Sequence, residues 1–333
     1  MADVVQMQKK IALLHRYPKD QIGETNAAFK YIKARGIDAL TFKKFSRLSK
    51  WKKFFKSIAW IFYAPCLVAG RGYDVIYCDD SYPFYPILVK AVSPRSKVIL
   101  RIGDFHLMYY TKGVLYNVLH FFERIGWIMA DGIIAISEVM ATHIEREIGN
   151  RPYVVLDPVD VDSFSGQKTY RDGTVMFHGV LTKNKNVDIL LEAARRLPSV
   201  DFKIIGDGPD MKRLQSIAPS NVFFQGWVPF KDIPLHIASC SIGVALRSEN
   251  IGNEYVVTSP YLQYGAMGKP CLVTRRMVYG DYEWQFSSAR EMTDKIKILL
   301  DRPEEGEKLR QYIVENHDAK KIGDEIWKIL LSA

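Results

Sequence analysis

Short apolar runs rich in Val and Ile recur along the chain, and each run ends at Gly, Asp or Ser before a segment with helical periodicity. This alternation is typical of parallel sheets whose two faces are both covered by helices. In the first half we predict strands over 10–15, 38–42, 74–79, 97–102, 132–136 and 153–157. In the second half we predict strands over 174–178, 201–206, 222–225, 241–246 and 270–274. The pattern therefore indicates two doubly wound α/β domains.

A segment rich in Pro, Ser, Gly and Asp, at 157–173, predicts the connection between these domains. From about 286 onward the periodicity is helical and no strand follows, so the apolar faces of this tail must pack elsewhere. A chain of 333 residues is also longer than one core usually accommodates. We divide it into an N-terminal domain, a linker, a C-terminal domain and a terminal helix that can pack back on the N-terminal domain, over 1–160, 161–172, 173–316 and 317–333 respectively.

The charge of the chain is concentrated in one place. Hydrophobic residues make up 48% of the chain and charged residues 25%, as in ordinary globular proteins. The net charge is +9, yet the segment 42–56 holds seven basic residues and no acidic one, so the rest of the chain carries +2. This distribution argues against a general nucleic-acid-binding surface. The four cysteines lack zinc or redox spacing and the first ten residues lack a signal-peptide core, which favours free thiols in the cytoplasm.

The basic segment also has an apolar side. On a helical projection Leu48, Trp51, Phe55, Ile58 and Phe62 fall within about 80°. The opposite arc carries Lys50, Lys52, Lys53 and Lys56. The two faces predict an amphipathic helix that lies on an anionic membrane surface. The apolar run that follows, 57–69, is too short to span the membrane. A core helix with a solvated lysine face is the alternative. The residues expected to contact the inner face of the cell membrane are Lys50, Trp51, Lys52, Lys53, Phe55 and Lys56.

Two strand ends in the second half carry residues suited to a diphosphate. The strand at 174–178 is followed by Gly179, and Lys185 lies where the next helix is expected to begin, so an ammonium and helix N-terminal amides meet. The stretch KIIGDGPD, 203–210, reads either as a tight turn or as the edge of a ligand cleft. Gly206 and Gly208 permit positive φ there, and Pro209 is expected to start the following helix, with Asp207 between them.

The stretch SPYLQYGAMGKP, 259–270, predicts a helix that Ser259 caps and Pro260 opens. The hydroxyls of Thr258 and Ser259, together with the first amides of this helix, can bind phosphate oxygens. Ordinary capping here, and solvated loop lysines around Lys185, are the alternatives.

Several stretches in order resemble the retaining GT-B glycosyltransferases of group 1, the family-four-like enzymes that use nucleotide-sugars. They are the three above together with VFFQGWVPFKDIPLHIASCSIGVAL, IIAISEVMATHI and VLDPVDVDSF, and they cover essentially the whole chain. The resemblance implies two Rossmann-like domains facing each other across a cleft. It also implies a UDP- or GDP-linked donor as substrate, no metal and no other cofactor.

The resemblance assigns further residues to the donor. Gln263 stands where the family usually has a glutamate that holds the ribose hydroxyls, and an amide can still bind two hydroxyls. The second family carboxylate corresponds to Glu249 or to Glu254, depending on where an insertion lies. The sequence also departs from the pattern, because Val180 replaces the usual arginine of the cationic clamp.

The first half is expected to supply the acceptor side. The strand at 97–102 leads to Asp104 and His106, whereas the position of the family's usual histidine is Gly103. Either side chain can orient an acceptor hydroxyl or take its proton. The loop with Gly23 and Glu24 is a candidate phosphate or acceptor loop, or an ordinary connection.

The sequence thus predicts a retaining hexosyltransferase that acts on a lipid-linked or glycan acceptor at the cytoplasmic membrane face, without nucleic acid. Two alternatives stay open. A nucleotide-sugar 2-epimerase shares the fold, and a membrane-associated partner subunit with a decayed donor site would explain Val180 and Gln263.

Overall fold

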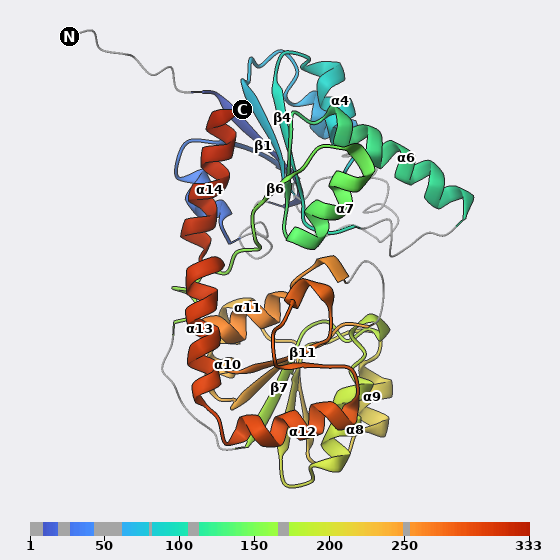
Figure 1. Cartoon of the computed structure of the whole chain (residues 1–333), viewed down its shortest axis with the longest axis vertical. Coiled ribbons are helices and arrows are strands. Elements are labelled where there is room, and N and C mark those ends of the chain that lie inside the picture. Colours follow the sequence, from blue (N-terminus) through green and yellow to red (C-terminus); the bar gives the residue numbers. More distant parts are fainter. Residues whose placement is uncertain are drawn as a thin grey trace, which may run out of the picture. The chain divides into compact units, whose positions relative to one another are not determined.

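A computed structural model describes residues 9–18, 27–42, 62–79, 82–105, 113–165, 173–248 and 254–333. The chain forms two compact units (Figure 1). Unit 1 comprises Met1–Asp157 together with Lys320–Ala333, and unit 2 comprises Pro158–Ala319. The end of the chain therefore belongs to the same unit as its beginning.

Unit 1 is built on a six-stranded sheet in the order β2-β1-β3-β4-β5-β6, in which all pairs are parallel. The strands are β1 (Ile11–Pro18), β2 (Asp38–Phe42), β3 (Val75–Asp79), β4 (Lys97–Ile102), β5 (Gly132–Ala135) and β6 (Tyr153–Val154). Their apolar runs are buried because helices cover both faces, as the continuous hydrophobic pattern predicts.

One face of the unit 1 sheet packs against α2 (Phe29–Lys33) and the last helix, α14 (Ala319–Ser332). Ile322, Ile326 and Leu330 of α14 share a core with strand residues of this sheet. The other face carries α4 (Tyr85–Val92), α6 (Val114–Met129) and α7 (Glu138–Ile148) (Figure 1). A Cβ at Gly126 of α6 would lie 2.0 Å from the carbonyl oxygen of Pro83, so α6 approaches the chain before α4 very closely.

Unit 2 is built on a second six-stranded parallel sheet, in the order β12-β11-β10-β7-β8-β9. The strands are β7 (Thr174–His178), β8 (Asp201–Ile205), β9 (Val222–Gly226), β10 (Ile242–Ala245), β11 (Cys271–Thr274) and β12 (Gln285–Phe286). Alternate residues feed two cores, since Val175 and Phe177 join one and Met176 joins the other.

The helices of unit 2 divide between these two cores. The first core is covered by α8 (Asp188–Arg196), α9 (Met211–Ile217) and α12 (Ala289–Leu300). The second is covered by α10 (Ile233–Ala238), α11 (Ser259–Ala266) and α13 (Glu304–Asn316). Because all strands run parallel, their carboxyl ends lie along one edge, where ligands bind in folds of this kind.

The predicted strands are confirmed as parallel sheet strands, with shifts of a few residues at their ends. The sequence did not predict β12, and α9 begins at Met211 rather than at Pro209. In the described parts of the chain, every helix is too short or too polar to cross a membrane.

Candidate active site at the carboxyl ends of the unit 2 strands

Two glycine loops meet at the edge formed by β7 and β8. The N–H of Gly179 donates to the carbonyl of Ile205 at 3.0 Å, and the N–H of Leu181 donates to the carbonyl of Asp207 at 3.0 Å. A Cβ on Gly206 would lie 1.9 Å from the carbonyl oxygen of Gly179. The structure therefore brings the predicted residues Gly179, Gly206 and Asp207 together, and only glycine fits at Gly206.

The turn after β8 follows the prediction in part. Gly206 has φ +135°, as expected, but Gly208 does not have a positive φ. A glycine is needed at Gly208 for space instead, because a Cβ there would lie 2.3 Å from the carbonyl oxygen of Leu181. The carboxylate of Asp207 accepts a hydrogen bond from the N–H of Gly208 at 2.7 Å, which shapes the turn.

Lys185 lies in a short 3-10 turn, η1 (Lys183–Lys185), and not at the start of α8 as predicted. The turn ends at Asn186, a non-glycine residue with φ +49°. The loop after β10 lies against this turn, because the N–H of Ser248 donates to the carbonyl of Asn184 at 2.8 Å and its hydroxyl donates to the Asn184 amide oxygen at 2.5 Å. Lys185 is thereby held beside the ends of both β7 and β10.

The start of α11 also differs from the prediction. Thr258 is the N-cap residue and Ser259 is the first helical residue, so Ser259 does not cap the helix. The hydroxyl of Tyr279, in η4 (Met277–Tyr279), accepts a hydrogen bond from the N–H of Thr258 at 3.2 Å. Burial raises the pKa of Tyr279 to about 12, and its hydrogen bonds with Thr258 and the nearby Arg247 guanidinium act in the opposite direction.

Two buried polar atoms at this edge have no hydrogen-bond partner within the described residues. They are Oε1 of Gln263, a side chain that is 7% exposed, and Nε2 of His178, which is 8% exposed. The His178 ring packs edge to face on Tyr264 of α11, with ring centres 5.1 Å apart. Burial lowers the pKa of His178 to about 3, with the charge of Lys185 as the smaller cause, so this imidazole is neutral at physiological pH. An unsatisfied buried polar atom costs about 1–3 kcal/mol, which a bound ligand would recover.

Two arginines that the sequence analysis missed lie at the ends of β10 and β11. The N–H of Arg247 donates to the Thr274 hydroxyl at 3.1 Å, and Arg276 donates from Nη2 to the carbonyl of Arg247 at 3.0 Å. The amide oxygen of Gln285 accepts from the N–H of Arg276 at 3.0 Å. These contacts hold the backbone of Arg247 and the guanidinium of Arg276 on the edge that also carries Lys185, whereas Val180 is an exposed apolar side chain.

The remaining predicted residues are distributed as follows. Glu254 is half-buried in a short turn before α11, and Asp104 is half-buried in the loop after β4 of unit 1. The other residues lie outside the described part of the chain, and they are Gly23, Glu24, Lys50, Trp51, Lys52, Lys53, Phe55, Lys56, His106 and Glu249.

Unit 1 has its own buried polar cluster, which the sequence analysis also missed. Arg101 of β4 is 4% exposed, and its guanidinium contacts Asp79 of β3 at 3.2 Å and Asp157 at 2.5 Å. Nε2 of His15 in β1 lies 3.7 Å from the same Asp79 carboxylate. The cluster ties the carboxyl ends of three strands together. A signal was available, because an arginine inside the apolar run of 97–102 requires a buried acid.

The family model of the group 1 glycosyl transferases matches residues 172–302, which include nearly all of this unit 2 edge. Unit 2 thus carries a group 1 glycosyltransferase domain. No curated protein sequence matches it significantly. The family match supports sugar transfer, and it does not favour the epimerase or the decayed subunit that the sequence left open.

Solved structures share the fold of this glycosyltransferase over almost its whole length. HepE from Anabaena, in complex with UDP and glucose, has a TM-score of 0.71 and 14% identity, over 98% of this chain and 100% of HepE. A glycosyltransferase from Rickettsia africae has a TM-score of 0.70 and 11% identity, over 97% and 98% of the two chains. The lipopolysaccharide outer core galactosyltransferase WaaB has a TM-score of 0.63 and 15% identity, over 97% and 100%. These similarities confirm the GT-B fold.

Proposed function

We propose that this glycosyltransferase moves a sugar from a UDP-linked donor to a lipid-linked or glycan acceptor, with retention of configuration at the anomeric carbon. The observation that carries the donor half is the pair of buried, unpartnered atoms, Oε1 of Gln263 and Nε2 of His178. Both lie on elements that converge on the edge of the unit 2 sheet. The complex of HepE with UDP and glucose, in the same fold, supports uridine as the base.

Fixed cations serve the diphosphate in this proposal. Lys185, Arg247 and Arg276 supply positive charge at the edge where Val180 leaves the usual clamp incomplete. Thr258 and Ser259 add hydroxyls at the start of α11, where the helix dipole favours an anion. Preorganised cations stabilise the negative charge that develops on a leaving diphosphate. We therefore expect transfer to need the donor as substrate but no metal and no cofactor.

The acceptor hydroxyl is the nucleophile. The bond between the anomeric carbon and the diphosphate oxygen breaks, and the acceptor oxygen bonds to the same face of the sugar. The proton of that hydroxyl passes to Asp104 or His106, which follow β4 in unit 1. Glu249 or Glu254 contacts the donor sugar.

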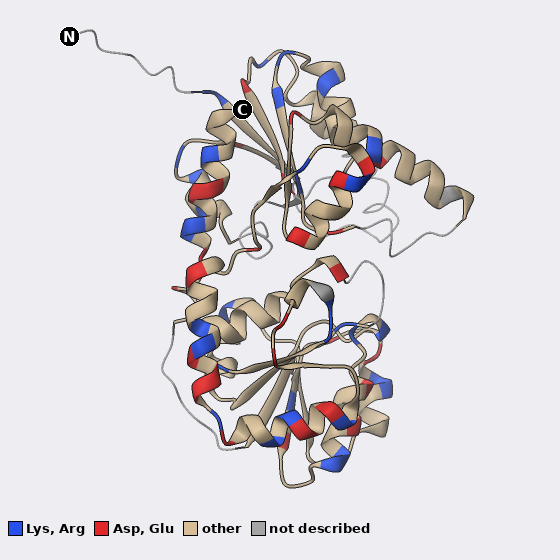
Figure 2. Cartoon of the chain, viewed as in Figure 1, with Lys and Arg blue, Asp and Glu red and all other residues tan. Residues whose placement is uncertain are grey.

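An apolar stripe on α6 supports membrane contact by unit 1. Six large side chains of this helix are exposed and fall within about 120° on a helical projection. They are Val114, Val118, Phe121, Phe122, Ile128 and Met129, with exposures from 36% to 80%. Figure 2 shows α6 with almost no charged residues. Such a patch is unusual on a free surface and indicates a lipid or protein partner.

The other side of α6 explains why the stripe faces outward. Glu123 is 3% exposed and accepts from His120 at 3.1 Å, and Trp127 is 1% exposed. The helix therefore cannot turn its apolar stripe inward without exposing Trp127. Phe62 and Tyr63, which follow the basic segment 42–56 after five further residues, are also exposed, at 61% and 57%. Cations and apolar side chains in one unit suit an anionic membrane surface.

Calorimetry with UDP, UDP-glucose, UDP-N-acetylglucosamine and GDP-mannose tests the donor. We expect UDP-linked donors to bind and the product of transfer to keep the anomeric configuration in its proton NMR spectrum. Failure of every UDP ligand to bind would overturn the donor assignment, and an inverted product would overturn retention. Sedimentation with phosphatidylglycerol vesicles tests the membrane separately.

A further inference from the structure

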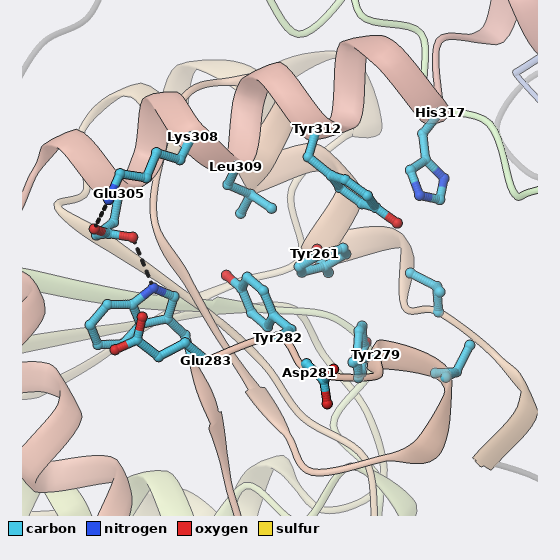
Figure 3. Close-up of a pocket in the computed structure, with 13 residues that line it drawn as sticks. Tyr261, Tyr279, Asp281, Tyr282, Glu283, Glu305, Lys308, Leu309, Tyr312 and His317 are labelled. Carbon is cyan, nitrogen blue, oxygen red and sulfur yellow. Dashed lines mark hydrogen bonds and ion pairs between the residues drawn. The ribbon is translucent and has the colours of Figure 1, made fainter.

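A pocket of about 480 Å³ lies within unit 2 (Figure 3). It is enclosed by α11, α13 and the segment 278–284 that leads from η4 to β12. Its size is in the usual range of about 300–1,000 Å³ for small-ligand sites. Its walls are unusually aromatic, with Tyr261, Tyr279, Tyr282, Trp284 and Tyr312 all lining it.

Tyr261 is the centre of the aromatic wall. Its ring lies 5.1 Å from that of Tyr279 and 5.3 Å from that of Tyr282, and both pairs are edge to face. Tyr312 approaches from α13 and is 45% exposed, so its ring is accessible from solvent. Figure 3 shows these rings around one hollow. The pocket therefore offers large apolar ring surfaces together with an open mouth.

The hydroxyl groups of the wall fall into two kinds. Those of Tyr279 and Tyr282 are used by the protein, since Tyr282 donates to the carbonyl of Cys271 at 2.8 Å and Tyr279 bonds with Thr258. Those of Tyr261 and Tyr312 make no hydrogen bond with any described residue. Burial raises the pKa of both groups, so they remain protonated donors at physiological pH. Two hydrogen-bonding groups are thus left for a ligand.

Carboxylates complete the rim. Asp281 and Glu283 are exposed, whereas Glu305 is occupied by Lys308 at 2.6 Å and by Nε1 of Trp284 at 3.2 Å. The pocket is net negative, which disfavours phosphates and other anions. Carboxylate oxygens accept hydrogen bonds from ligand hydroxyls, and tyrosine hydroxyls both donate and accept.

We propose that this pocket binds a neutral saccharide unit. Aromatic rings cover the apolar C–H face of a sugar, while Tyr261, Tyr312, Asp281 and Glu283 bond its hydroxyls. A cationic ligand would use the rings and carboxylates but would leave the two tyrosine donors without a role. The natural ligand, on this view, is a remote part of the glycan acceptor; that identity rests on the proposed function, whereas saccharide binding itself does not.

The test uses the full chain, saturated with UDP so that the donor edge is blocked. Maltotriose, N,N′-diacetylchitobiose and mannobiose are titrated by calorimetry and by saturation-transfer NMR. We expect at least one of them to bind. Tyr312→Ala should weaken that binding about tenfold, and Tyr261→Phe, which removes only a hydroxyl, about two- to tenfold. UDP binding should stay unchanged in both variants.

Phe223→Ala is the matched control, because Phe223 is a 54% exposed aromatic residue of unit 2 that does not line the pocket. Saccharide binding should be unchanged in it. No binding of any saccharide by the parent protein, equal losses in the control, or tighter binding of tetramethylammonium than of the sugars would overturn the proposal. Failure of the parent protein to bind UDP would instead count against the proposed donor and not against the saccharide pocket.

Discussion

The hydroxyl oxygen of Tyr279 lies 3.2 Å from both the backbone nitrogen and the side-chain oxygen of Thr258, the N-cap residue of α11. One tyrosine thus has its ring in the aromatic pocket and its hydroxyl on the cap of the helix proposed to bind the diphosphate. A group that serves two sites is expected to affect both when it is changed.

Tyr279→Phe should therefore lower stability by about 1 kcal/mol and weaken UDP binding about two- to tenfold, because the cap loses its partner. Urea unfolding and calorimetry measure the two effects. Tyr282→Phe is the control, since it loses a similar bond to the carbonyl of Cys271, away from Thr258. Equal weakening of UDP binding in both variants would show that the cap has no special role.

Lys185→Ala should weaken UDP binding far more than uridine binding, because the ammonium is expected to contact phosphate. Lys183→Ala, two positions earlier in the same turn, should affect neither ligand much. The same Lys185 change should raise the pKa of His178, since the positive charge of Lys185 lowers it. That pKa should stay below its ordinary value, because burial is the larger cause. Equal losses for UDP and uridine would contradict the phosphate role.

The titration of His178 predicts a pH dependence of stability. Its pKa is about 3 in the folded protein and about 6.5 in an unfolded chain, so between these values the unfolded state binds more protons. The contribution of a neutral His178 is complete above pH 6.5 and is lost as the pH falls from 6.5 toward 3, by up to about 1.4 kcal/mol per pH unit. In urea unfolding, His178→Gln should lose less stability over this range than the parent. Parallel pH profiles would contradict the neutral, buried state of His178.

The apolar stripe of α6 should contribute to membrane binding. Phe121→Gln combined with Ile128→Gln should reduce sedimentation with anionic vesicles at every salt concentration. Leu235→Gln should not, although Leu235 is 72% exposed in unit 2. Replacement of Lys50, Lys52, Lys53 and Lys56 by Gln should reduce binding mainly at low salt, because charges are screened over about 8 Å at physiological ionic strength. If the parent protein does not sediment with anionic vesicles, the membrane hypothesis is wrong and a soluble acceptor is favoured.

Asp104→Asn and His106→Ala should slow sugar transfer by about 10²–10⁴-fold if the altered residue takes the acceptor proton. UDP binding should stay near that of the parent, because both residues belong to unit 1. Steady-state transfer rates and UDP titrations separate these effects. Normal turnover by both variants would place the acceptor chemistry elsewhere.

The sheets were predictable because buried parallel strands leave a mark that depends on local sequence alone, such as VILRI at 98–102. β12 has only two residues, Gln285 and Phe286, and too short a run carries no pattern. The cap of α11 was wrong for a different reason. Thr258 and Ser259 are both good capping residues, and the bond between Thr258 and Tyr279 joins positions 21 apart in sequence.

In the site, too, local sequence predicted some features, whereas contacts between residues distant in sequence determined the others. Glycines at two strand ends indicated a ligand-binding edge, whereas the close approach of Gly206 to Gly179 and the need for glycine at Gly208 depend on backbone carbonyls that only the structure places. His178, Arg247 and Arg276 gave no signal, because a lone histidine or arginine has no meaning until its neighbours in space are known. The burial of His178 and the contacts of the two half-buried arginines, which depend on the whole sheet, make them candidates.

The position of α14 affects the order in which the two units can fold during synthesis. Unit 1 needs Ile322, Ile326 and Leu330 to close one face of its sheet, but these residues are synthesised after all of unit 2. A ribosome makes about 5–20 residues per second and domains usually fold in the order of synthesis. Here that order is reversed, because unit 2 can complete its fold before α14 has been synthesised to cover the sheet of unit 1. We therefore expect chaperones that bind exposed apolar sheet surface to bind unit 1 of the nascent chain rather than unit 2.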